Sequence, residues 1–313
     1  MKDYSEKRLL ITGASGLLGL NLALEYANEF QVIGIVNNHL LKEACFQVVQ
    51  TDLLEEGAVE QVFSRYQPDW VLHCAALADI GLCERNPDRA EELNVRLPGI
   101  IARNAHANAA RLIHISTDAV FDGQEGGYRE DSQTNPINVY AKTKLAGERE
   151  VFECYPEALV VRLNLFGWSR SGKRSLAEFF FNNLAHQREV FGFTDVFFTP
   201  LLANDLADLF LPMLDSETKG LFHLGSPEKI SKYQFGLEIA QRFGFSEELI
   251  HPVLMEEAKI KASRGKDLSL LTDKFESSFS ASIPELSTGL NRFFGLYQQG
   301  YPQKLQDLSR KAV

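Results

Sequence analysis

The sequence predicts an α/β fold built on a doubly wound parallel sheet, with a smaller, mostly helical lobe formed by later parts of the chain. Short aliphatic runs alternate with longer helical patterns through the first half of the 313 residues. Two of these runs, WVLHCAA and RLIHIS, are apolar at nearly every position, which is typical of strands covered on both faces. A glycine-rich turn follows the first run. Regular alternation of this kind gives parallel strands joined by right-handed crossovers.

Six strands are expected in the first half, each a run of aliphatic or β-branched residues: Arg8–Thr12, Gln31–Val36, Phe46–Gln50, Asp69–Ala75, Arg111–Ser116 and Ala158–Leu163. Helical periodicity lies between most of them, at Leu17–Asn28, Glu55–Tyr66, Pro87–Ala107 and Asn138–Cys154.

The alternation loosens after Gly167, and the pattern is helix-rich from Ser226 onward. We therefore expect residues 1–166, with a return segment at about 196–225, to form the sheet domain. Residues at about 167–195 and 226–313 are expected to form a second lobe that binds substrate. The aromatic run Phe179–Phe181 is expected in the core or between the lobes.

Composition narrows the function classes. The chain has 32 basic and 42 acidic side chains, a net charge of −10, which argues against a protein that binds nucleic acid polymers or anionic membranes. No apolar run approaches the ~18 residues of a membrane span, and the polar start leaves no room for a signal peptide. The four cysteines show no CxxC pairing, and no acidic or histidine cluster has metal-ligand spacing. A cytoplasmic protein with buried free thiols and no metal is expected.

The first strand leads into the turn GASGLLG, with glycines at Gly13, Gly16 and Gly19. Gly13 suits the tight turn, Gly16 lets the backbone approach a pyrophosphate, and Gly19 allows close packing of helix on strand. The helix start then favours phosphate through its free N–H groups and its dipole. The turn therefore predicts a Rossmann-type dinucleotide site, with Ser15 and Leu17 among its contacts.

The residues after the second and third strands bear on which dinucleotide is bound. An acidic residue at the end of the second strand would accept the adenine-ribose hydroxyls, but Asn37 stands about there. The missing carboxylate removes a repulsion against a 2′-phosphate, so NADP is preferred over NAD. Asp52, followed by Leu53, either accepts a hydrogen bond from the adenine amino group or is an ordinary helix N-cap.

Tyr140 and Lys144 lie one helical turn apart and so share one helix face. A phenol with a pKa of ~10 is a poor acid–base catalyst at neutral pH, and a neighbouring ammonium is expected to lower that pKa. The pair can then exchange a proton with a carbonyl oxygen while hydride moves at carbon. The strand end at Ser116 and Thr117 supplies a hydroxyl that helps to hold that carbonyl.

Together these elements resemble the extended short-chain dehydrogenase/reductase family. The segments ISTDAVFDG, PINVYAKTKLAGE, FFTPLLANDLAD, RGKDLSLLT and IPELSTGLNRFF look like its dTDP-4-dehydrorhamnose reductase branch. The resemblance implies Thr117 as the catalytic hydroxyl, Tyr140 as the proton donor and Lys144 as its partner, which also holds the nicotinamide ribose. It further places Ala75 and Ala76 against the cofactor and Asn94 in a supporting role.

Three departures from that branch leave the substrate and a metal-assisted homodimer contact open. Leu201 stands where the branch has threonine, and Gly265 follows the arginine where it has proline. The segment ALADIGLCE lacks an acid–lysine pair that some members carry around Gly81 and Leu82.

Further polar residues have competing interpretations. The segment Trp168–Arg174 holds three cations, and Arg170 and Lys173 either bind a substrate diphosphate or belong to a solvated loop. Arg264 is a similar candidate. His73 and His114 are expected to be core histidines with satisfied nitrogens. Glu148, beside Arg149 and Glu150, is expected on an exposed helix face.

The sequence thus predicts an NADP(H)-preferring reductase of the 4-keto group of a nucleotide-linked deoxysugar. A sugar-nucleotide epimerase or another ketone reductase on the same scaffold is the first alternative. The second is a non-catalytic dinucleotide-binding subunit, because the regulatory subunit of methionine adenosyltransferase resembles the same branch.

Overall fold

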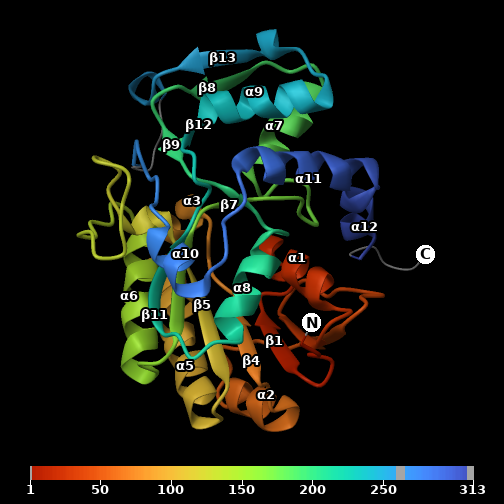
Figure 1. Cartoon of the computed structure of the whole chain (residues 1–313), viewed down its shortest axis with the longest axis vertical. Coiled ribbons are helices and arrows are strands. Elements are labelled where there is room, and N and C mark those ends of the chain that lie inside the picture. The colour runs from red at the N-terminus through yellow and green to blue at the C-terminus, as the bar shows by residue number, and fades with distance from the viewer. Residues whose placement is uncertain (1, 259–264, 309–313) are drawn as a thin grey trace.

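The computed structural model describes residues 2–258 and 265–308 and contains a seven-stranded parallel sheet at its centre (Figure 1). Across the sheet the strand order is β11-β6-β5-β4-β1-β2-β3, and every neighbouring pair is parallel. Its strands are β1 (Arg8–Thr12), β2 (Gln31–Val36), β3 (Gln47–Gln50), β4 (Trp70–His73), β5 (Arg111–Thr117), β6 (Leu159–Leu163) and β11 (Gly220–Leu224). The predicted doubly wound parallel sheet is confirmed.

Helices cover both faces of the sheet because successive strand residues point to opposite sides. Leu9 and Ile11 of β1 belong to the core on the side of α1 (Leu17–Tyr26) and α8 (Leu206–Leu214). Leu10 belongs to the opposite core. That core also takes apolar residues from α2 (Ala58–Tyr66), α5 (Leu97–Ala107) and α6 (Val139–Cys154).

The core on the α1 side continues among the later helices, which lie above the sheet in Figure 1. It includes Trp168, which stacks on Phe293 at 4.1 Å between ring centroids. The helices there are α7 (Leu176–Ala185), α9 (Lys232–Phe243), α11 (Leu286–Gln298) and α12 (Tyr301–Asp307). Short strand pairs that the sequence did not indicate join them: β7 (Leu165–Phe166) with β10 (Leu201–Leu202), β9 (Phe197–Phe198) with β12 (Ile230–Ser231), and β8 (Val190–Phe193) with β13 (Ile250–Val253). The exact division into two domains stays a prediction.

The single helix expected over Pro87–Ala107 is interrupted. It consists of α4 (Pro87–Glu91), a π-helical turn over Glu92–Arg96, and α5. Pro98 has no N–H to donate to the carbonyl of Asn94, one turn earlier, so regular α-helical bonding fails there. Two shorter helices complete the set, α3 (Ile80–Arg85) and α10 (Asp273–Phe279).

Gly147 of α6 packs against the Asn94 carbonyl. A Cβ built on Gly147 would lie 2.0 Å from the Asn94 oxygen, closer than any side chain can come. The glycine therefore sets how closely α6 approaches the π-helical turn.

The expectation that Glu148 lies on an exposed helix face is wrong. Its side chain is 4% exposed and forms a forked ion pair with Arg162 of β6, with Nε–Oε1 at 2.9 Å and Nη2–Oε2 at 2.7 Å. The Ser116 hydroxyl donates to the same carboxylate, and the Arg162 guanidinium lies 5.2 Å from the Phe121 ring centroid. This buried cluster ties α6 to β5 and β6.

Two expectations drawn from composition can be compared with the structure. Within residues 2–258 and 265–308, no helix is long and apolar enough to cross a bilayer. All four cysteines are free, but only Cys83 is buried, and Cys45 is exposed. The prediction of buried thiols is therefore wrong for Cys45.

The Gly147 contact predicts a large effect of one methyl group. Gly147→Ala should lower the free energy of unfolding by about 1–3 kcal/mol or more, because backbone atoms on both sides must move apart. Gly295→Ala in α11 is the matched control, since nothing lies within 4 Å of its Cβ position; it should stabilise by roughly 0.5–1 kcal/mol. Denaturant unfolding of both variants measures the difference, and equal stabilities would contradict the packing described.

Candidate active site

The glycine turn lies where the strand order of the sheet reverses, between the carboxyl ends of β1 and β4, which is where open α/β sheets bind ligands. Gly13 has φ +68°, and its Cβ would lie 2.9 Å from the backbone of Ala75. A Cβ on Gly19 would lie 2.5 Å from the Gly13 oxygen. Gly16 is the N-cap of α1, and no side chain caps this helix start. The three glycine positions therefore leave little or no room for a side chain, and the helix start leaves its backbone N–H groups accessible to a ligand.

A cavity of about 460 Å³ opens above this turn. It is bounded by the ends of β1, β4, β5 and β6, by α6, and by the loop that precedes α7. Predicted site residues that line it are Gly13, Gly16, Leu17, Gly19, Ala76, Ser116, Thr117, Tyr140, Lys144 and Lys173.

Other predicted cofactor contacts lie outside the lining of this cavity: Ser15, Asn37, Asp52, Leu53 and Ala75. Asn37 follows β2, and its carbonyl accepts a hydrogen bond from Gln50 at 3.0 Å. Asp52 accepts from the Leu54 N–H at 3.0 Å, and because α2 begins at Ala58, Asp52 is not the N-cap of that helix.

Some of the predicted substrate contacts also line this cavity, and others do not. Asn94 is fully buried, donates to the Leu77 carbonyl and the Thr143 hydroxyl, and accepts from the Leu77 N–H at 2.8 Å. It therefore holds the segment after β4 instead of facing the cavity. Arg170 does not line the cavity, whereas Lys173 does. Arg264 lies outside the described residues.

Helix α6 positions the tyrosine and the lysine. Asn138 caps its N-terminus by accepting from the Ala141 N–H at 2.8 Å, which places Tyr140 in the first turn. Lys144 is 2% exposed, and its Nζ donates to the Ile115 carbonyl of β5 at 2.7 Å. Thr117, at the end of β5, donates to Asp118 at 3.0 Å and accepts from the Ala119 N–H.

Burial dominates the titration of both groups. It raises the pKa of Tyr140 to about 12, although a hydrogen bond with Thr117 acts in the opposite direction. Burial also lowers the pKa of Lys144 to about 8, against the attraction of Glu148. The expectation that Lys144 lowers the pKa of Tyr140 is therefore wrong for the chain without ligand. A protonated tyrosine is nonetheless the form that donates a proton.

The two core histidines lie beneath this site as a stacked pair, with ring centroids 5.2 Å apart. His73 Nδ1 lies 2.7 Å from the Thr12 hydroxyl, and His114 Nε2 lies 3.3 Å from Lys144 Nζ. Both rings are buried, as expected, but the other nitrogen of each ring has no partner among the described residues. Burial lowers the pKa of His73 to about 3 and that of His114 in the same direction, so both rings are neutral. A neutral His114 accepts a hydrogen bond from the lysine.

A second cavity of about 240 Å³ adjoins the first and shares Thr117, Tyr140 and Asn164 with it. Among the polar residues that line it, sequence reasoning missed Asp118, Asn164 and Lys232. Asn164 donates to Asp118 at 2.8 Å, and burial raises the pKa of Asp118 to about 6. Asp118 and Asn164 directly follow β5 and β6, so their position at strand ends was the available signal. The remaining lining is largely apolar and includes Phe121, Phe197 and Phe198.

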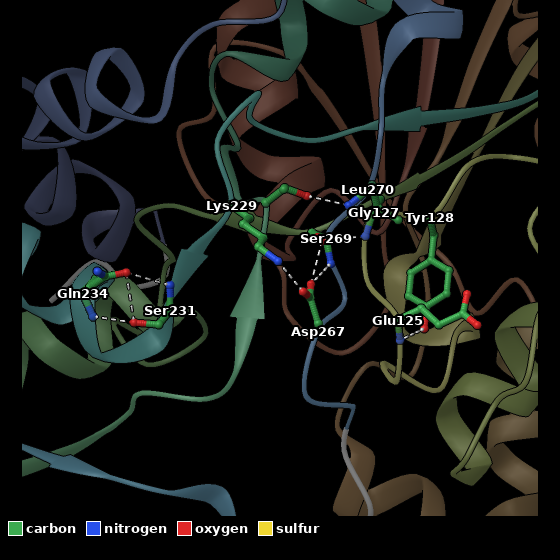
Figure 2. Close-up of polar contacts among 10 residues, drawn as sticks. Glu125, Gly127, Tyr128, Lys229, Ser231, Gln234, Asp267, Ser269 and Leu270 are labelled. Atoms are coloured by element: carbon green, nitrogen blue, oxygen red, sulfur yellow. Dashed lines mark hydrogen bonds and ion pairs between the residues drawn. The ribbon is translucent and has the colours of Figure 1, made fainter.

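Gly265 and Leu268 line this second cavity, and Figure 2 shows polar contacts that hold their segment through Asp267, Ser269 and Leu270. Asp267 accepts from Lys229 Nζ at 2.7 Å and from the Ser269 hydroxyl at 2.6 Å. The Leu270 N–H donates to the Thr199 hydroxyl at 3.2 Å. A Cβ on Gly265 would lie 2.8 Å from the Asp122 oxygen. The glycine that stands where the resembling branch has proline therefore packs very closely against backbone.

Comparisons with known proteins agree with this geometry. The family model described as the RmlD substrate binding domain matches residues 7–299.

Within the described residues, no group of three or more His, Cys, Asp or Glu side chains could hold a metal ion.

Two relatives and one solved structure illustrate what this chain is similar to. Methionine adenosyltransferase 2 subunit beta of Bos taurus is 33% identical over 286 residues, covering 88% of this chain and 83% of the relative. The probable low-salt glycan biosynthesis reductase Agl14 of Haloferax volcanii is 32% identical over 286 residues, covering 90% and 95%. The crystal structure of dTDP-4-dehydrorhamnose reductase from Bacillus anthracis in complex with NADP superimposes with a TM-score of 0.81 at 25% identity, covering 92% of this chain and 99% of that chain.

Solved neighbours were crystallised with NADP or with NAD. The matched family, the relatives and the fold confirm the resemblance seen in the sequence motifs. The chain belongs to the RmlD substrate-binding domain family, whose structural neighbours here are dTDP-4-dehydrorhamnose reductases of the extended short-chain dehydrogenase/reductase type.

Proposed function

We propose that this protein is an NADPH-preferring reductase of the 4-keto group of a nucleotide-linked deoxysugar, with Thr117, Tyr140 and Lys144 as its catalytic residues. One observation carries the proposal. Thr117 and Tyr140 stand on the shared wall of two adjoining cavities, one above the glycine turn and the other lined by aromatic and polar side chains. A hydride donor and a ketone in these two cavities would meet at the tyrosine.

The residues of the first cavity fit a dinucleotide. Gly13, Gly16 and Gly19 pack so closely against neighbouring backbone that a Cβ would be crowded at each, and they lie at the start of a helix whose N–H groups no side chain caps. The bound cofactor would supply the hydride. Asn37 in place of an acid after β2 favours NADP over NAD, and the NADP complex of the Bacillus anthracis reductase supports that preference.

The chain's own residues then orient the ketone and supply the proton. The Tyr140 hydroxyl, whose pKa burial raises to about 12, is protonated and would donate to the ketone oxygen as negative charge develops there. Thr117 would hold that oxygen. Lys144 has three N–H donors and directs two of them at Ile115 and His114, which leaves one for the cofactor ribose.

A regulatory subunit is the second candidate, because methionine adenosyltransferase 2 subunit beta is 33% identical over most of this chain. In that case the dinucleotide would bind without turnover. We also propose a cytoplasmic location, which the free cysteines support, and a homodimer as the assembly.

The proposal is tested by following NADPH and NADH oxidation in parallel with dTDP-4-keto-6-deoxyglucose and its epimerase. Faster oxidation of NADPH than of NADH, dependent on the sugar nucleotide, supports it. No oxidation of either cofactor, together with co-purification of a larger catalytic partner, would favour the regulatory subunit. Tightly retained NAD without net oxidation would favour an epimerase.

Replacing the proton donor should separate catalysis from binding. Tyr140→Phe should lower kcat by about 10²–10⁴-fold, the usual contribution of general acid catalysis, with the Kd for NADPH unchanged. Tyr297→Phe, a half-exposed tyrosine of α11, is the control and should keep full activity. Full activity of Tyr140→Phe would contradict the role proposed for the tyrosine.

The pKa of Lys144 predicts that kcat/KM falls at alkaline pH. Its pKa of about 8 in the free chain means that the ammonium is lost as pH rises through 8. Because the charged form is needed, kcat/KM should fall about tenfold per pH unit above that value. Initial rates between pH 6 and 10 measure this, and a profile that stays flat to pH 10 would show that the lysine charge is not required.

A further inference from the structure

The loop over Ser169–Ser175, between β7 and α7, is held in place by one buried carboxylate. Glu178 in the first turn of α7 is fully buried. It accepts hydrogen bonds from the Ser169 N–H at 2.6 Å, the Arg174 N–H at 2.7 Å and the Ser175 N–H at 3.1 Å. The Ser169 hydroxyl also donates to it at 2.9 Å. Backbone donors at both ends of the loop therefore converge on a single anion.

The middle of the loop has its own support. Gly172 has φ +67°, a conformation that favours glycine, and its carbonyl accepts from the Asn182 side chain at 2.6 Å. The turn is consequently built by the sequence around it, with the two residues after Gly172 in a defined place. Those residues are Lys173 and Arg174.

Lys173 and Arg174 are exposed cations that line the cavity above the glycine turn, together with Gly13 and Gly16. Neither side chain has an ion-pair partner among residues 2–258 and 265–308. Asp79 is the one carboxylate among the described lining residues of this cavity, and it is engaged in capping α3 through the Leu82 N–H. Two unpaired cations thus face the glycine turn in a chain whose net charge is −10.

We propose that Lys173 and Arg174 form a cationic clamp on the pyrophosphate of the dinucleotide, and not on the diphosphate of the sugar nucleotide. The inference rests on the dinucleotide site of the proposed function. The cavity that would take the sugar has Lys232 among its lining residues but neither Lys173 nor Arg174. The glycine turn offers a pyrophosphate only N–H groups and a helix dipole, so two formal negative charges would otherwise have no cation opposite them.

The hydrogen bonds to Glu178 lower the entropy cost of binding through Lys173 and Arg174. Because the loop backbone is already fixed, binding orders only the two side chains. Arginine adds forked contacts to phosphate oxygens, and lysine adds a point charge. Both should make dinucleotide binding depend on salt concentration.

The test measures dinucleotide binding directly, without sugar substrate. Lys173→Gln, Arg174→Gln and the double variant are titrated with NADPH, NADH and ADP-ribose by calorimetry at low salt. Each single change should raise Kd about tenfold, as loss of a charge-assisted hydrogen bond does, and by the same factor for all three ligands, since all carry the pyrophosphate. Arg188→Gln, an exposed arginine after α7, is the charge-matched control and should leave each Kd unchanged.

The outcomes separate the clamp from its alternatives. A loss confined to NADPH would assign the cations to the 2′-phosphate and overturn the proposal. Unchanged Kd values with a raised KM for the sugar nucleotide would assign them to the substrate and overturn it as well. A wild-type chain that binds none of the three ligands would also refute it. If the expected losses occur while no sugar nucleotide is reduced, the clamp stands and the proposed function fails.

Discussion

The candidate active site depends on how helix α6 is fixed against strand β5. Lys144 donates to the Ile115 carbonyl at 2.7 Å, and one turn later Glu148 accepts from Ser116 on the same strand. Arg162 completes the second contact from β6. These attachments set the rotation of the helix about its axis, so that Tyr140, one turn before Lys144, meets Thr117 at the end of β5. A buried pair of this kind is costly to break, because loss of one partner leaves the other charge without compensation in the core.

Charge in this molecule is arranged locally, and the net value of −10 does not show where single charged groups lie. The buried carboxylates of Glu148 and Glu178 organise structure: Glu148 holds α6, and Glu178 holds the loop that carries Lys173 and Arg174. Lys144 is buried beside two neutral histidines, so its charge is poorly solvated and its pKa falls. Burial therefore governs the titration of the site more than pairing between its members does.

Sequence patterns predicted what depends on residues close together in the chain. The strand-to-helix turn at Gly13–Gly19 and the one-turn spacing of Tyr140 and Lys144 carry their geometry locally, and both elements form as expected. Glu148 was misplaced because its partner lies on a different strand, and nothing in a helical charge pattern indicates a partner there. The one signal was an arginine inside the apolar run LVVRL. Asp118, Asn164 and Lys232 were missed for the same reason, since three separate elements bring them into one cavity.

In the proposed reaction, hydride reaches a sugar carbon while Tyr140 protonates the adjacent oxygen. Its most direct test supplies NADPH carrying deuterium at the transferable C4 position and analyses the sugar-nucleotide product by mass spectrometry and NMR. We expect one deuterium per product molecule, bound to C4 of the sugar. Product formed without deuterium at C4, or a labelled cofactor that stays unchanged through turnover of the sugar, would contradict it.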